Sequence, residues 1–234
     1  MFNAHTEQHP FAAAQAQPDA RAAFIRRTYA HLAGALFALL VLETILLNLP
    51  GIENLIVLMI GQQYSWLVVL GLFMGATWMG QSMANSNTSV STQYFGLAVF
   101  VVAYAIIFLP ILYIASHHYP GVIAEAGMVT LLLFAGLTAT VFITRKDFSF
   151  LGPIVAIGGL IALGTIVVGI VFGFTLGLLF STLMVALAAA AILYQTSNIL
   201  HRYNPNQHVA ASLALFGAVA MLFFYILRIF MARR

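Results

Sequence analysis

The stretch T-R-K-D-F-S-F-L-G-P (residues 144–153) separates two long apolar runs and combines a basic pair, a helix-start signal and a proline. Its basic pair favours the cytoplasmic side of a membrane, where lysine and arginine collect in short links. Asp147 and Ser149 could each cap the helix that follows, because both side chains accept hydrogen bonds from free first-turn amides. Pro153 would lie in that first turn, where its missing N–H costs little. We expect a structural turn that helps set topology; the alternative is a partner-binding loop.

The composition indicates a membrane protein on both sides of this stretch. Hydrophobic residues make up 62% of the 234 residues and charged residues 6%, with a mean hydropathy of +1.01. Soluble domains have roughly 25% charged residues. The chain has no cysteine, which excludes disulfides and thiolate metal sites. The net charge of +3 is small and lies in the links, so it bears on insertion direction and does not indicate nucleic acid as a partner.

Seven apolar stretches are each long enough for a membrane helix of about 20 residues. Helices are expected because lipid cannot satisfy open backbone groups. The predicted spans cover residues 24–49, 64–83, 93–116, 122–143, 150–172, 176–200 and 208–231, and the shorter run 52–63 is predicted to be a link at the membrane interface. Residues 1–21 are polar and contain two prolines, so we expect a mobile amino-terminal tail before a single transmembrane domain at 22–234.

The basic residues favour an amino terminus in the cytoplasm. Seven spans would then place six basic residues on the inner side and three on the outer side. The three outer residues are Arg228, Arg233 and Arg234, which fit a cytoplasmic end better. A last segment that re-enters from the cytoplasm therefore stays open as an alternative.

Glycines spaced four apart allow helix backbones to approach closely. Gly71 and Gly75 have this spacing in the second span, and Gly169, Gly173 and Gly177 repeat it farther along. We expect packing between neighbouring helices of one chain, in preference to a dimer interface.

Three segments resemble those of the Bax inhibitor-1 family. They are R-R-T-Y-A-H-L-A-G (residues 26–34), the stretch at 144–153, and Y-Q-T-S-N-I-L-H (residues 194–201), which is similar to the family's Y-D-T-x-x-I-I-H. Order and spacing also match, and the resemblance covers roughly residues 21–232. It implies an all-α polytopic membrane protein of seven transmembrane helices, with two three-helix layers around a central carboxyl-terminal helix.

The resemblance also implies a pair of buried aspartates that this chain lacks. Gln195 stands at the first family position, and Gly217 or Ala218 stands at the second. Close buried carboxylates can share protons as pH changes, whereas glutamine cannot titrate. We therefore expect neither the family's acid switch nor a calcium site of carboxylates. A run like T-S-N-I also occurs in the bacterial modulators of the protease FtsH, which modestly favours those relatives.

Ionisable residues at membrane depth mark the candidate site, because each costs on the order of 3 kcal/mol at the bilayer centre unless partnered. With the amino terminus inside, Glu43, Glu125 and Arg228 all fall in the outer third. We expect an ion pair of Arg228, with Glu43 as the preferred partner, acting as a structural clamp or as an outer gate. His31 lies near the cytoplasmic end of its helix, where it is expected to be a packed residue and is the candidate titrating group.

Several enzyme and cofactor classes lack their residues here. The single lysine, Lys146, is in a link and cannot hold retinal, and the two aspartates, Asp19 and Asp147, lie outside the spans that an aspartyl protease needs. One deep histidine, His31, suits neither a serine protease nor bis-histidine haem. We expect no enzyme, no cofactor and no metal site.

Two functions remain. The first is a regulatory or interaction protein of the bacterial inner membrane, whose partner is a membrane protease or its scaffold and whose tail is the natural handle. The second is a leak channel for calcium or another cation that lacks the family's acid switch.

Overall fold

The computed structural model describes residues 17–62, 64–85 and 89–234. Within these ranges the chain forms eight α-helices, of which seven are long and apolar enough to cross a membrane. They are α1 (Pro18–Leu47), α2 (Ile52–Ile60), α3 (Ser65–Ala84), α4 (Val90–His118), α5 (Val122–Thr144), α6 (Leu151–Phe172), α7 (Leu178–His201) and α8 (His208–Ala232). The all-α class and the seven predicted spans are confirmed.

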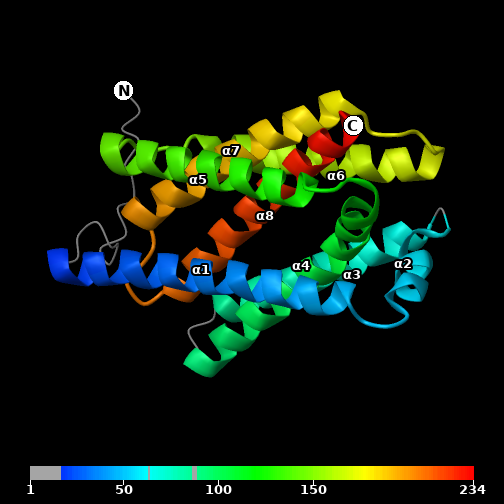
Figure 1. Cartoon of the computed structure of the whole chain (residues 1–234). Coiled ribbons are helices and arrows are strands. Elements are labelled where there is room, and N and C mark those ends of the chain that lie inside the picture. Colours follow the sequence, from blue (N-terminus) through cyan, green and yellow to red (C-terminus); the bar gives the residue numbers. More distant parts are fainter. Residues whose placement is uncertain (1–16, 63, 86–88) are drawn as a thin grey trace.

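Two layers of three long helices enclose the last helix (Figure 1). In one layer α4 packs against both α1 and α3, and in the other α7 packs against both α5 and α6. Helix α8 runs diagonally between the layers and contacts α1, α3 and α4 on one side and α5 and α7 on the other. The arrangement that the family resemblance implied is the one observed.

The connections define two ends of the bundle (Figure 1). The end of α3, the start of α4 and the links α5–α6 and α7–α8 lie at the end where α1 begins, which we call the motif end. The links α4–α5 and α6–α7, with α2 and the residues after α8, lie at the other, the arginine end. Helix α8 is one continuous helix from the motif end to the arginine end. It extends along the whole bundle, which favours seven spans over the re-entrant alternative.

Helix α1 starts earlier than the sequence predicts. It begins at Pro18, with proline in the first turn and Asp19 beside it, and both residues suit a helix start. Of the tail expected at residues 1–21, positions 1–16 lie outside the described residues. The predicted interface link forms the short helix α2, whose Ile52 and Ile56 pack with Leu109 of α4.

Gly80 and Gly96 form a backbone contact between α3 and α4. A Cβ atom built on Gly96 would come within 2.6 Å of the Gly80 carbonyl oxygen, and one on Gly80 within 2.8 Å of the Gly96 oxygen. At Gly71, Gly75 and Gly177 a Cβ would meet nothing within 4 Å. The predicted packing between helices is therefore wrong for Gly71 and Gly75 of α3, because a side chain there would meet no neighbour. Gly177 precedes α7, Gly173 also meets nothing within 4 Å, and Gly169 contacts only the link that follows its own helix, at Phe174 and Leu176.

Candidate functional site

The two family segments meet at the motif end. The Ser197 hydroxyl of α7 donates to Asp147 Oδ1 at 3.2 Å, and the Phe148 N–H donates to Ser197 Oγ at 2.9 Å. His201 lies one turn on, with Nδ1 3.0 Å from the Ser197 carbonyl oxygen. The α5–α6 link is therefore bonded to the end of α7 by residues that stand about 50 positions apart in the chain.

The prediction that Asp147 or Ser149 caps the helix after the link, which is α6, is wrong. Helix α6 has Phe150 at its N-cap and no side-chain cap hydrogen bond. Asp147 Oδ1 instead accepts the Ser149 N–H at 2.8 Å, in a local turn, as well as the Ser197 hydroxyl. Partial burial opposes the ionised form, but the bonds from Ser149 and Ser197 and the nearby His201 outweigh it and lower the pKa of Asp147.

A glycine completes this junction. A Cβ on Gly152 would lie 2.9 Å from Cε2 of the Tyr194 ring, closer than side-chain contacts allow. The absence of a side chain at Gly152 in the first family segment thus leaves room for the ring of Tyr194 in the second. Ser197 and Gly152 were not singled out from the sequence, although the joint occurrence of the two segments was a usable signal for their contact.

His31 links three helices at the same end. Its Nδ1 lies 2.7 Å from the Arg27 carbonyl oxygen, which can only accept, so Nδ1 carries the donated proton. In the neutral ring Nε2 then accepts from the Tyr94 hydroxyl at 2.7 Å. The ring of His208, at the start of α8, lies edge-on with centroids 4.9 Å apart. The role of His31 as a titrating group stays a prediction, and Tyr94 and His208 are the side chains that contact its ring.

Glu43 lies deep in the bundle. It is 5% exposed and continues the buried stripe of α1 that includes Leu32, Ala35 and Leu39. Both carboxyl oxygens are without a hydrogen-bond partner among the described residues. The preferred Arg228–Glu43 pair is therefore wrong in this structure.

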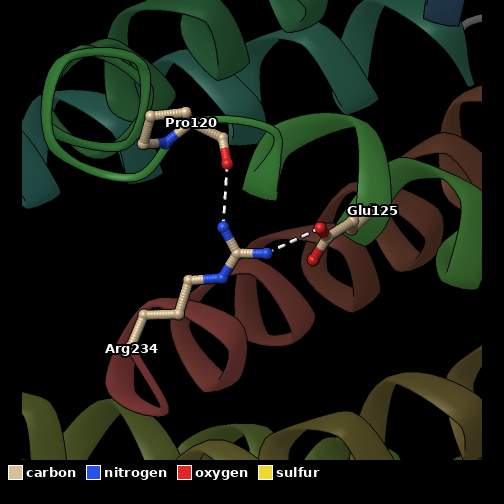
Figure 2. Close-up of polar contacts among 3 residues, drawn as sticks. All are labelled: Pro120, Glu125 and Arg234. Carbon is tan, nitrogen blue, oxygen red and sulfur yellow. Dashed lines mark hydrogen bonds and ion pairs between the residues drawn. The ribbon is translucent and has the colours of Figure 1, made fainter.

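Arg228 and Glu125 also have partners other than those predicted. Arg228 Nη2 donates to the Leu176 carbonyl oxygen at 3.0 Å. Glu125 pairs with Arg234, whose Nη2 lies 2.6 Å from Glu125 Oε1 while its Nη1 donates to the Pro120 carbonyl at 2.8 Å (Figure 2). Arg228 in α8 and Arg234 just after it both reach links between helices at the arginine end. The expected depth in the membrane suggested which charged residues were close together, but a long arginine side chain can instead donate to a backbone carbonyl oxygen in a nearby link.

The family's aspartate positions contain no carboxylate here, and Gly217 offers little room for one. Gln195 is half-buried and its Oε1 accepts a 3.5 Å bond from the Asn198 amide of the same helix. A Cβ on Gly217 would lie 3.2 Å from the Tyr104 hydroxyl and 3.5 Å from the Phe100 ring. Ala218 is buried at 6% exposure. Aromatic side chains of α4 fill the space beside α8 at this level.

These features define a polytopic helical membrane protein with a mostly apolar central helix and polar contacts concentrated at its two ends. The profile of the family described as "Inhibitor of apoptosis-promoting Bax1" matches residues 21–234. The chain belongs to the Bax inhibitor-1 family.

Individual relatives match at moderate identity. An uncharacterized protein of Pseudomonas aeruginosa is 39% identical over 47% of this chain and 49% of its own length. "Modulator of FtsH protease YccA" of Escherichia coli is 35% identical over 46% of the chain and 49% of its own length. "Bax inhibitor 1" of Schizosaccharomyces pombe is 26% identical over 92% of the chain and 79% of its own length. The matches to the two bacterial proteins thus span about half of each.

Proposed function

We propose that this chain is a regulatory protein of a bacterial inner membrane that modulates a membrane protease. The observation that carries the proposal is the centre of the bundle, where Gln195, Gly217 and Ala218 replace the family's titrating pair and aromatic rings flank α8. A bundle centre of this kind suits an interaction protein better than an acid-gated conduit. The similarity to a relative described as a modulator of FtsH protease gives the partner class.

The proposed sidedness places the motif end in the cytoplasm. The α5–α6 link there carries exposed Arg145 and Lys146, and α1 begins beside Arg21, Arg26 and Arg27. Basic residues near span ends favour the cytoplasmic side. A relative described as "Inner membrane protein YccA" supports the same membrane.

Reconstitution tests the proposal directly. The chain is incorporated into proteoliposomes with an FtsH-type protease and a fluorescent membrane substrate, at ratios from zero to equimolar. We expect the degradation rate to change progressively with the ratio, and the protease to co-purify with the chain. An unrelated seven-helix protein at the same density is the control. An unchanged rate together with no co-purification would refute the proposal.

The second candidate, a cation leak, is favoured by one observation. Glu43 is a buried carboxyl group with no hydrogen-bond partner among the described residues, and such groups inside membranes often mark ion pathways. Vesicles loaded with a calcium or proton reporter, assayed from pH 6 to 8, separate the two functions. We expect no flux above that of protein-free vesicles. Flux that is present and disappears in Glu43→Gln would establish the leak instead.

A further inference from the structure

A cavity of about 630 Å³ lies between the two layers at the arginine end. Helices α3 and α4 form one wall, α6 and α7 the other, and α8 lines the back. Its lining is apolar through most of its length, and the side chain of Arg228 contributes to it. This size is within the roughly 300–1,000 Å³ range of sites that bind small molecules.

The cavity opens towards the surroundings of the bundle. Met74 of α3 and Phe174 after α6 line it and are 44% and 48% exposed. These residues belong to or adjoin membrane-spanning helices, so the opening faces lipid. Along α6 the lining extends from Gly159 to Gly173, which at 1.5 Å per residue corresponds to a length of roughly 20 Å. A cavity of this shape accommodates one extended alkyl chain.

Arg228 gives the cavity a charge without a matching counter-charge. Its guanidinium donates one described hydrogen bond, to the Leu176 carbonyl, and the described residues place no carboxylate within 4.0 Å of it. A guanidinium has five N–H donors, so most of its capacity is open to a ligand. Tyr225, three residues earlier on α8, lines the cavity on the same side. A cation in the lining of an otherwise apolar cavity favours an anion attached to a hydrophobic tail.

We propose that this cavity binds a single-chain anionic amphiphile of the long-chain fatty acid class, with its carboxylate on Arg228 and its chain directed towards Gly159. Arginine holds a carboxylate through two parallel N–H bonds, which fixes the headgroup. The volume suits one chain, which favours a fatty acid over a two-chain phospholipid. The site is independent of the proposed protease partner, because it is formed inside the bundle.

Photolabelling of the purified full-length chain tests this inference. The probe is a palmitate analogue with a photoreactive group near its methyl end, and the competitors are palmitate, methyl palmitate and phosphatidylglycerol. We expect labelling near Met184 and Met221, and competition by palmitate at concentrations about 10- to 100-fold below methyl palmitate, since charge-assisted hydrogen bonds are strong. Equal competition by methyl palmitate, or stronger competition by phosphatidylglycerol, would overturn the proposal.

Two matched pairs of variants make the test specific. Arg228→Gln should weaken binding about 10-fold or more, whereas Arg233→Gln, which removes an exposed charge nearby, should leave it unchanged. Arg228→Lys, which keeps the charge, should bind better than Arg228→Gln. A Cβ on Gly159 or on Gly164 meets nothing within 4 Å, but only Gly159 lines the cavity. Gly159→Leu should therefore block labelling and Gly164→Leu should not; equal effects within either pair would count against the site.

Discussion

The two ends of the bundle are held together in different ways. At the motif end, short side chains join the α5–α6 link to α7 through Asp147 and Ser197, and Gly80 meets Gly96 backbone to backbone. At the arginine end, Arg228 of α8 and Arg234 just after it reach the carbonyl oxygens of links between helices. Short side chains and glycines fix an atomic fit, whereas long side chains accept whichever carbonyl lies in reach. Substitutions at the motif end should therefore cost more.

The largest effect is expected from Gly96→Ala. The added methyl group would lie 2.6 Å from the Gly80 carbonyl oxygen, so α3 and α4 must separate, at a cost of about 2–3 kcal/mol. Gly71→Ala in α3 is the matched control, because its methyl group meets nothing within 4 Å and alanine favours helix. Unfolding in mixed micelles measures both. Equal stabilities would show that the α3–α4 contact is looser than the structure has it.

A smaller loss, of about 1–2 kcal/mol, is expected from Ser197→Ala. The substitution removes the bond to Asp147 and leaves the Phe148 N–H without its acceptor. Thr182→Ala in the same helix is the control, since the hydrogen bond of that hydroxyl among the described residues is to the Leu178 carbonyl of its own helix. The same unfolding assay compares the two, and a Thr182→Ala loss as large as that of Ser197→Ala would contradict the junction's importance.

The junction should also give the stability a dependence on acid. The pKa of Asp147 is lowered in the folded state, so its contribution is fully present above the unfolded value of about 4 and is lost as pH falls through the lower folded value. Unfolding midpoints of the natural chain and of Asp147→Asn, measured from pH 7 to pH 3, should differ at neutral pH and converge in acid. A gap that widens in acid would reverse the sign and reject the assignment.

The smallest effect is expected from Arg234→Gln. The side chains of Arg234 and Glu125 are 44% and 50% exposed, and pairs of this kind contribute about 0–1 kcal/mol. A double-mutant cycle with Glu125→Gln isolates the coupling, which should shrink in high salt. A coupling energy larger than the stability lost in Ser197→Ala would remove the contrast between the two ends.

Sequence reasoning predicted the helices better than their contacts. Apolar runs ended by Pro50-Gly51 or Gly173 set seven spans whose type and order the structure confirms, and the family segments implied the layered arrangement. The partners of Arg228 and Glu125 could not be obtained in this way. Depth in the membrane says nothing of helix rotation, and an arginine side chain is long enough to bypass a carboxylate for a carbonyl.

The glycines also show that sequence alone does not give the contacts between helices. The four-residue spacing of Gly71 and Gly75 suggested a contact face, yet the face that meets α4 carries Gly80. Spacing identifies residues on one side of a helix, but the packing partner decides which side is used. The cap expected at Asp147 also failed, since its carboxylate accepts the Ser149 N–H in a local turn and the Ser197 hydroxyl of α7.

The central position of α8 has a consequence for how the protein is made. In the most apolar window of α8, 72% of the residues are buried, the highest share among the seven candidate spans, and α8 follows all the other helices along the chain. During synthesis the helices of the two layers are therefore in the membrane before α8 is made, and the space between the layers is filled only when α8 leaves the ribosome and inserts there. The central helix is therefore the last to be added. A nascent chain stalled before residue 208 would expose to lipid the helix surfaces that pack against α8 in the complete bundle.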